Sequence, residues 1–279
     1  MSDTIAVVFD FDDTLAPDST SSFLANLGID VPAFWQDEVQ PLVDIGWDPI
    51  PAYLYKMIEL AQNGHDIDKA SLVDWGKKIK PFQGATRVFN RVRRHALSTH
   101  DKVIVEFYLI SSGIGDILRN TNLASYFSDI WSCDFHYGKD GKIAFPRNIV
   151  SFTDKTRYLF QISKGITGSR VRGKPFDVNK KVDHSKLRVP FDQMIFVGDG
   201  LTDVPCFSLV RKNGGIAIGV FDKHEKEKWG RAWGFIEDGR VSNLVPADFS
   251  KDSALSLSLM MAVENMAKKI KLNGQTYQG

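Results

Sequence analysis

Three carboxylates lie within four residues of one another near the start of the chain. Asp10, Asp12 and Asp13 directly follow the apolar residues 5–9. Clustered carboxylates repel one another and lose hydration when they are buried, so another group must compensate for their charge. A Mg²⁺ ion can do so, because it prefers oxygen ligands from carboxylates, waters and phosphate groups. The alternative for Asp12 or Asp13 is a cap on a following helix. The cluster therefore indicates a metal site or a helix cap.

Two further polar clusters have the same placement. Asp199 and Asp203 follow the apolar residues 194–197, and Ser111, Ser112 and Gly113 follow residues 103–110. In parallel sheets, ligands bind outside the carboxyl ends of the strands. If these apolar stretches are neighbouring strands, both acidic clusters can supply carboxylates to one ion. This shared placement favours a catalytic metal site over two unrelated helix caps.

The elements that must position these residues follow an α/β pattern. Uninterrupted apolar stretches predict strands that are covered on both faces of a mostly parallel sheet. We expect these strands at residues 5–9, 103–110, 194–197 and 216–218. Stretches with helical character separate or follow them, and we expect helices at residues 85–95, 116–126, 155–162 and 253–270.

Residues 17–84 interrupt this pattern. They show helical periodicity, many aromatic residues, and prolines at positions 32, 41, 49 and 51. We therefore expect an inserted α-helical cap domain at 17–84, within an α/β core formed by residues 1–16 and 85–279. Because the insertion directly follows the first acidic cluster, it could act as a lid over the site.

Two segments of the core have patterns of their own. Residues 133–146 predict a hairpin, because Asp140 and Gly141 favour a tight turn between antiparallel strands. Residues 163–190 carry eight basic and two acidic residues. This segment predicts a basic excursion from the core. It is either a solvated loop or a surface that faces the substrate, a partner or a second copy of the chain.

The composition excludes several classes of protein. The 279 residues are 43% hydrophobic and 25% charged, with a formal net charge of +1, so no global field favours nucleic-acid binding. No stretch approaches the roughly 18 apolar residues that span a membrane. The start lacks the basic and apolar regions of a signal peptide. Two cysteines are too few for a disulfide framework, so we expect a cytoplasmic protein.

In combination, these motifs resemble those of the haloacid dehalogenase (HAD) superfamily, in its phosphoserine phosphatase-like branch. Residues 5–14 resemble its first motif, an apolar strand followed by Asp-x-Asp-x-Thr, and Ser111 matches the serine that ends its second. Lys155 matches the lysine that precedes a helix in its third motif, and residues 198–203 match the Gly-Asp-Gly-x-x-Asp of its fourth. The resemblance implies a Rossmann-like three-layer sandwich with a helical cap.

The resemblance also implies an activity, the Mg²⁺-dependent hydrolysis of a small phosphorylated metabolite through an aspartyl-phosphate. Asp10 would be the nucleophile and Asp12 the general acid and base. The metal would be held by Asp10, the backbone carbonyl of Asp12, and Asp199, with Thr14 and Asp203 in support.

The phosphoryl group would be bound by Ser111, Ser112, Gly113 and Lys155. Phosphoserine phosphatases carry a glutamate nine residues after the nucleophile, which contacts the substrate's amino group. Here that position is Ser19, so an amino-acid substrate is not implied.

Three other functions remain open at this point. A phosphotransferase or phosphomutase would use the same aspartyl-phosphate but pass the phosphoryl group to an alcohol. A phosphate-accepting signalling protein also presents clustered aspartates, a serine or threonine and a lysine at strand ends. An adaptor protein would use the basic excursion to bind its partner.

Overall fold

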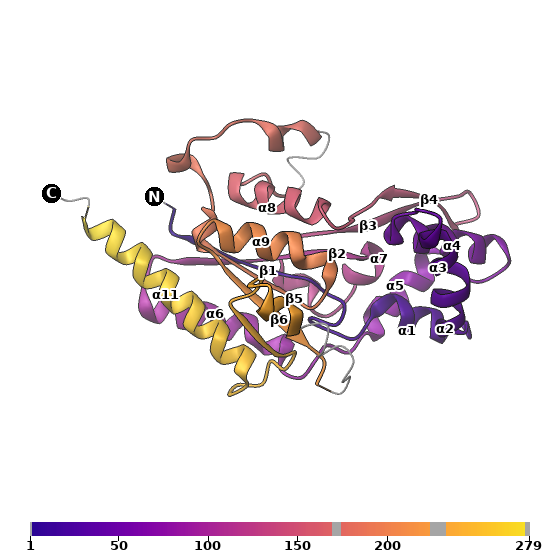
Figure 1. Cartoon of the computed structure of the whole chain (residues 1–279), viewed down its shortest axis with the longest axis horizontal. Coiled ribbons are helices and arrows are strands. Elements are labelled where there is room, and N and C mark those ends of the chain that lie inside the picture. The colour runs from indigo at the N-terminus through magenta and orange to yellow at the C-terminus, as the bar shows by residue number, and fades with distance from the viewer. Residues whose placement is uncertain (1, 169–173, 224–232, 277–279) are drawn as a thin grey trace.

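The computed structural model describes residues 2–168, 174–223 and 233–276 (Figure 1). Within these residues, seven strands form one sheet in the order β4-β3-β2-β1-β5-β6-β7. In this spatial order, all neighbouring strands pair in parallel except β4, which pairs antiparallel with β3. The expected α/β fold with a mostly parallel sheet is confirmed. The strands are β1 (Thr4–Phe9), β2 (Ile104–Ile114), β3 (Asp129–Tyr137), β4 (Ile143–Asn148), β5 (Met194–Gly198), β6 (Ile216–Phe221) and β7 (Asn243–Pro246).

Helices cover both faces of this sheet and make the three layers of the sandwich. α6 (Ala85–Thr99) and α11 (Ala254–Thr276) pack together on one face, and α8 (Asp154–Lys164) and α9 (Val204–Lys212) pack on the other (Figure 1). Every residue of β1 and β5 is buried as a result. This double cover explains why these strands are apolar without alternation.

Most of the predicted core elements are present, but the prediction of one helix is wrong. Instead of a helix over 116–126, the chain forms the short helix α7 (Gly115–Leu118) and a 3-10 turn, η2 (Ala124–Tyr126). Asn120 Nδ2 donates to Asp116 O at 2.8 Å, and Thr121 Oγ1 donates to Leu118 O at 2.9 Å. These side chains occupy carbonyls that a longer helix would use, so the helix ends early.

Residues 17–84, which we call the helical insertion, lie at one end of the sheet (Figure 1). Asp18, Asp30, Asp48 and Asp68 each cap the start of a helix, and prolines occupy the first turns of α2, α3 and α4. The division of the chain into a core and a separate cap domain stays a prediction. The helices of the insertion are α1 (Ser19–Asn26), α2 (Val31–Ala33), the π-helix η1 (Phe34–Val39), α3 (Gln40–Asp44), α4 (Pro49–Gln62) and α5 (Lys69–Lys78).

The predicted hairpin is formed by β3 and β4, and it contacts the helical insertion. Its turn contains Gly141 with a φ of 80°, a left-handed conformation that glycine adopts without strain. Lys142 Nζ donates to Ala61 O at 3.0 Å, and Ile143 N donates to Ile67 O at 3.2 Å. The hairpin thus joins the sheet to the insertion.

The basic segment 163–190 is described in part. Arg170 and Arg172 lie outside the described residues. The described part contains the 3-10 turns η4 (Pro175–Asn179) and η5 (His184–Lys186), and two more such turns, η6 (Phe191–Gln193) and η7 (Leu201–Asp203), follow along the chain. Arg188 pairs with Glu106 on β2, so part of the positive charge is neutralised within the molecule. The binding of a partner by this segment stays a prediction.

Among the helices in the described ranges, none has the length and apolar character needed to cross a bilayer.

Candidate active site

The first acidic residues lie in a tight loop that follows β1. Asp10 N donates to Val197 O of β5 at 2.9 Å, which holds the start of the loop between two central strands. Leu15 N then donates to Phe11 O at 2.8 Å and closes the turn. Asp13 has a φ of 54°, a left-handed conformation that aspartate tolerates better than most residues. The loop therefore places Asp10 at the carboxyl end of β1, as expected.

A glycine makes room for the second acidic cluster. A Cβ atom at Gly198 would lie 2.3 Å from Asp203 Oδ2, so no larger residue fits there without moving that carboxylate. Gly200 N donates to the same oxygen at 3.2 Å. Asp203 is thereby held against the end of β5, with Asp199 beside it.

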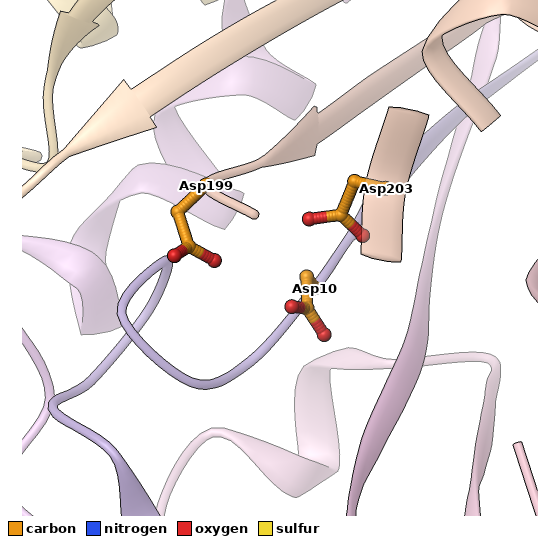
Figure 2. Close-up of side chains that lie close together, drawn as sticks. All are labelled: Asp10, Asp199 and Asp203. Atoms are coloured by element: carbon orange, nitrogen blue, oxygen red, sulfur yellow. The ribbon is translucent and has the colours of Figure 1, made fainter. Parts of the chain in front are cut away.

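The two loops bring three carboxylates together (Figure 2). One oxygen each of Asp10, Asp199 and Asp203, which we call the acidic cluster, lie within 4.8 Å of one another. Asp10 and Asp203 are buried, and Asp199 is partly exposed. Burial raises the pKa of Asp10 to about 6, although Lys155 opposes the shift. Burial and the neighbouring carboxylates Asp10 and Asp203 also raise the pKa of Asp199.

Lys155, in the first turn of α8, is the cation of this site. It is fully buried, and its Nζ donates to Asp203 Oδ1 at 2.7 Å and to Thr202 Oγ1 at 3.2 Å. Nζ also lies 3.3 Å from Asp10 Oδ1. Burial alone would lower the pKa of Lys155, but the carboxylates of Asp10 and Asp203 outweigh it and hold the pKa above its ordinary value. The lysine is therefore charged at neutral pH.

One lysine does not balance the acidic cluster. Asp10 Oδ1 is buried, and Lys155 does not approach it with hydrogen-bond geometry, so this oxygen has no hydrogen-bond partner among the residues that the structure describes. Three converging carboxylates and an unpartnered buried oxygen form a suitable donor set for a hard divalent cation such as Mg²⁺. Thr14 Oγ1 donates to Asp199 Oδ1 at 3.2 Å and orients that carboxylate. The residues present thus fit a metal ion.

Asp12 lies on the other side of the loop, beside β2. Its Oδ1 accepts from Ser19 N at 2.7 Å, and its Oδ2 would be 2.6 Å from a Cβ atom at Gly113. Ser111 Oγ accepts from Gly113 N at 3.1 Å. Burial, followed by the charge of Asp18, raises the pKa of Asp12 well above its ordinary value. Asp12 thus lies close to the predicted phosphate-binding residues.

β2 differs slightly from expectation. We expected the strand to end before Ser111, but β2 continues to Ile114, with an irregularity in its pairing between Ile110 and Ile114. Ser112 Oγ is buried and has no hydrogen-bond partner in the described part of the chain. Ser112 O accepts from the hydroxyl of Tyr53 at 2.6 Å. A strand irregularity beside a site can redirect side chains toward it.

Two residues that contribute to the site, Ser19 and Tyr53, were not predicted from the sequence. Ser19 N fixes the carboxylate of Asp12, and Tyr53 of α4 reaches β2 from the helical insertion. The sequence showed Tyr53 only as one of several aromatics, so no signal marked it. Asp18 accepts from Thr20 N and Ser21 N, both at 2.9 Å, and so caps α1.

Comparisons with known proteins support the fold. No family model matches this chain. An uncharacterized protein from Borreliella burgdorferi is 25% identical over 279 residues, which cover 90% of this chain and 93% of that protein. A HAD family hydrolase from Salmonella enterica serovar Typhi has a TM-score of 0.60 at 12% identity, covering 94% of this chain and 71% of that one.

Two further solved structures are similar. A phosphoserine phosphatase in its apo form has a TM-score of 0.55 at 15% identity, covering 89% of this chain and 95% of its own. A phosphoserine phosphohydrolase-like protein from Francisella tularensis has a TM-score of 0.51 at 16% identity, covering 92% of this chain and 98% of that one. This chain therefore has the fold that HAD family hydrolases share with phosphoserine phosphatases.

Proposed function

We propose that this chain is a phosphatase of the HAD superfamily that depends on Mg²⁺ and hydrolyses a small phosphate monoester. One observation carries the proposal: the acidic cluster and the buried Lys155 meet at the carboxyl ends of β1 and β5. A phosphate monoester is a dianion that repels an anionic nucleophile, so its site must combine a carboxylate with compensating positive charge. The arrangement of these four residues meets that requirement.

The metal would be held by Asp10, Asp199 and the carbonyl of Asp12. Asp203 already accepts hydrogen bonds from Lys155 and Gly200 N, which suits it to a supporting role. When bound, Mg²⁺ would neutralise charge on the phosphoryl group and orient it. Ser111 and the N–H group of Ser112 would bind phosphoryl oxygens, and Lys155 would add positive charge. Gly113 N, which donates to Ser111 Oγ, would orient that hydroxyl toward the phosphoryl group.

Two carboxylates would then perform the chemistry. Asp10 attacks phosphorus and forms an aspartyl-phosphate, while the bond from phosphorus to the alkoxide breaks. Asp12 gives its proton to that alkoxide, and its raised pKa keeps the proton available. Ionised Asp12 next takes a proton from a water that attacks phosphorus. Inorganic phosphate leaves, and Asp10 is restored.

The helical insertion would act as the lid of this site. The hydroxyl of Tyr53 on α4 donates to Ser112 O on β2, and this contact between the insertion and the site supports the role. Covering the site would exclude bulk water during transfer and would limit the substrate to small molecules. A phosphorylated metabolite as substrate and a cytoplasmic location both stay predictions from the sequence.

Hydrolysis of 4-nitrophenyl phosphate in ¹⁸O-labelled water tests the proposal. We expect turnover with Mg²⁺, no turnover with excess EDTA, and one labelled oxygen in each phosphate released. Ser111→Ala should reduce the rate by about 10²–10³-fold, the usual cost of losing one transition-state donor. Metal-independent turnover, or release of phosphate without label, would contradict the proposed reaction.

A further inference from the structure

A hollow lies between the start of α6 and the segment 249–251 that precedes α11. Its volume is about 560 Å³, within the range of small-molecule sites. None of the residues to which we assign catalytic roles lines it. It is therefore distinct from the candidate active site.

The walls of this hollow are positively charged. Arg87, Arg91 and Lys251 line it, and none of its described lining residues is acidic. Arg87 and Arg91 are one helical turn apart on α6, so they share a face. Within the described parts of the chain, none of these three cations lies within ion-pair distance of a carboxylate. Burial, and then the charges of Arg87 and Arg94, lower the pKa of Arg91, although Asp252 acts in the opposite direction.

One of these cations, Arg87, lies at the positive end of a helix. α6 has 15 residues, a glycine at its N-cap, no side-chain cap and no acidic residue in its first turn. Arg87 lies within that first turn, where the helix dipole favours anions and disfavours cations. Repulsion between like charges and the unfavourable dipole would both be relieved by a bound anion.

The hollow has a rigid wall. Gly84 and Phe249 are in such close contact that a Cβ atom at Gly84 would lie 2.2 Å from Phe249 O. Phe249 N donates to Gln83 O at 2.9 Å, and the Arg91 guanidinium donates to Phe249 O and, at 3.3 Å, to Ser256 Oγ. Arg91 Nε is buried and has no hydrogen-bond partner within the described residues. Arg91 is thus fixed in place by Phe249 and Ser256.

We propose that this hollow is a second anion site, which takes a small soluble molecule that carries more than one phosphate group. The guanidinium fork matches phosphate oxygens, and three cations suit a multiply charged ligand. Pyrophosphate is the simplest compound of this class. The proposal does not depend on the catalytic activity proposed above.

Calorimetric titration of the full-length protein with pyrophosphate tests the proposal. EDTA in the buffer removes metal from the acidic cluster, so that the active site repels the probe. We expect one pyrophosphate per chain. The double variant Arg87→Gln, Lys251→Gln should weaken binding by about a hundredfold, because each charged contact contributes about tenfold. Both side chains are exposed, so the fold should survive their replacement.

Two matched variants serve as controls. Lys102→Gln with Lys139→Gln also removes two exposed positive charges but leaves the hollow unchanged, and Ser111→Ala alters only the active site. Both should bind pyrophosphate like the wild type. No binding by the wild type, equal weakening in the charge control, or loss of binding in Ser111→Ala would overturn the proposal. Sedimentation with anionic lipid vesicles that depends on Arg87 and Lys251 would overturn the assignment to a soluble ligand.

Discussion

The position of the Asp12 side chain depends on the residues that contact it as well as on its place in the sequence. Ser19 N holds one carboxylate oxygen, and the missing side chain at Gly113 leaves room for the other. Residue types and spacing predicted Asp12, Ser111 and Gly113 as site residues. They did not predict the contact from Ser19, because a backbone N–H carries no signature of residue type.

The Gly113→Ala variant tests this tight placement. The new Cβ atom would lie 2.6 Å from Asp12 Oδ2 and 3.3 Å from Ser111 Oγ, so the carboxylate must move. We expect kcat for 4-nitrophenyl phosphate to fall by about 10²-fold, the cost of displacing a catalytic group by about 1 Å. Steady-state kinetics with Mg²⁺ measure this effect.

Gly274→Ala is the matched control. A Cβ atom at Gly274, on α11, meets no atom within 4 Å. Its kcat should equal that of the wild type. A Gly113→Ala protein with wild-type kcat would show that Asp12 needs no fixed position.

At the scale of elements, a part-buried hydrogen bond joins α4 to β2. Tyr53 is 4% exposed, and its hydroxyl donates to Ser112 O at 2.6 Å. This contact joins the helical insertion to the strand that carries the predicted phosphate-binding residues.

Tyr53→Phe should therefore loosen the insertion. The change removes a part-buried hydrogen bond, whose loss costs about 0.5–1.5 kcal/mol of the free energy of unfolding. For a chain of this size, we expect a Tm lower by about 2–4 °C per kcal/mol. We also expect a higher KM for 4-nitrophenyl phosphate. Thermal unfolding and steady-state kinetics measure the two effects.

Tyr55→Phe removes a hydroxyl from the same helix and is the control. Tyr55 is 39% exposed and donates to Glu59 at 2.6 Å, in contact with water. Its replacement should change neither Tm nor KM appreciably. If Tyr53→Phe behaves like Tyr55→Phe, the contact of α4 with β2 does not hold the insertion in place.

Some elements are encoded locally in the sequence and others are not, for physical reasons. The strands β1 and β5 are buried on both faces, so their unbroken apolar runs identify them. The helix expected at 116–126 does not form, because the side chains of Asn120 and Thr121 donate to backbone carbonyls of α7. The placement of the insertion depends on long-range contacts such as that of Tyr53, which periodicity does not encode.

For the molecule as a whole, the acidic cluster makes the free energy of unfolding depend on the pH and on a bound metal ion. The folded pKa of Asp10 is about 6, above its ordinary value of 3.8. The stabilisation from this group is complete below about pH 3.8 and is lost as the pH rises through about 6. Near neutral pH the metal-free protein therefore carries uncompensated negative charge, which a bound cation would offset.

Mg²⁺ should consequently raise Tm more at about pH 7.5 than at about pH 5, where protons already neutralise Asp10. Thermal unfolding with and without Mg²⁺ at both pH values measures the difference. Asp199→Asn should reduce the shift at the higher pH, because it removes a metal ligand and a repelling charge. Equal shifts at both pH values, or a full shift in Asp199→Asn, would contradict a metal site at the acidic cluster.

The most direct measurement compares Asp10→Asn with Asp13→Asn in the hydrolysis of 4-nitrophenyl phosphate. Both variants remove one carboxylate from the same loop, and asparagine tolerates the left-handed conformation of residue 13. If Asp10 carries the phosphoryl group, Asp10→Asn should lose more than about 10³-fold in kcat while it stays folded. Asp13→Asn should stay within a few-fold of the wild type. Mg²⁺-dependent turnover by Asp10→Asn at the wild-type rate would contradict the account.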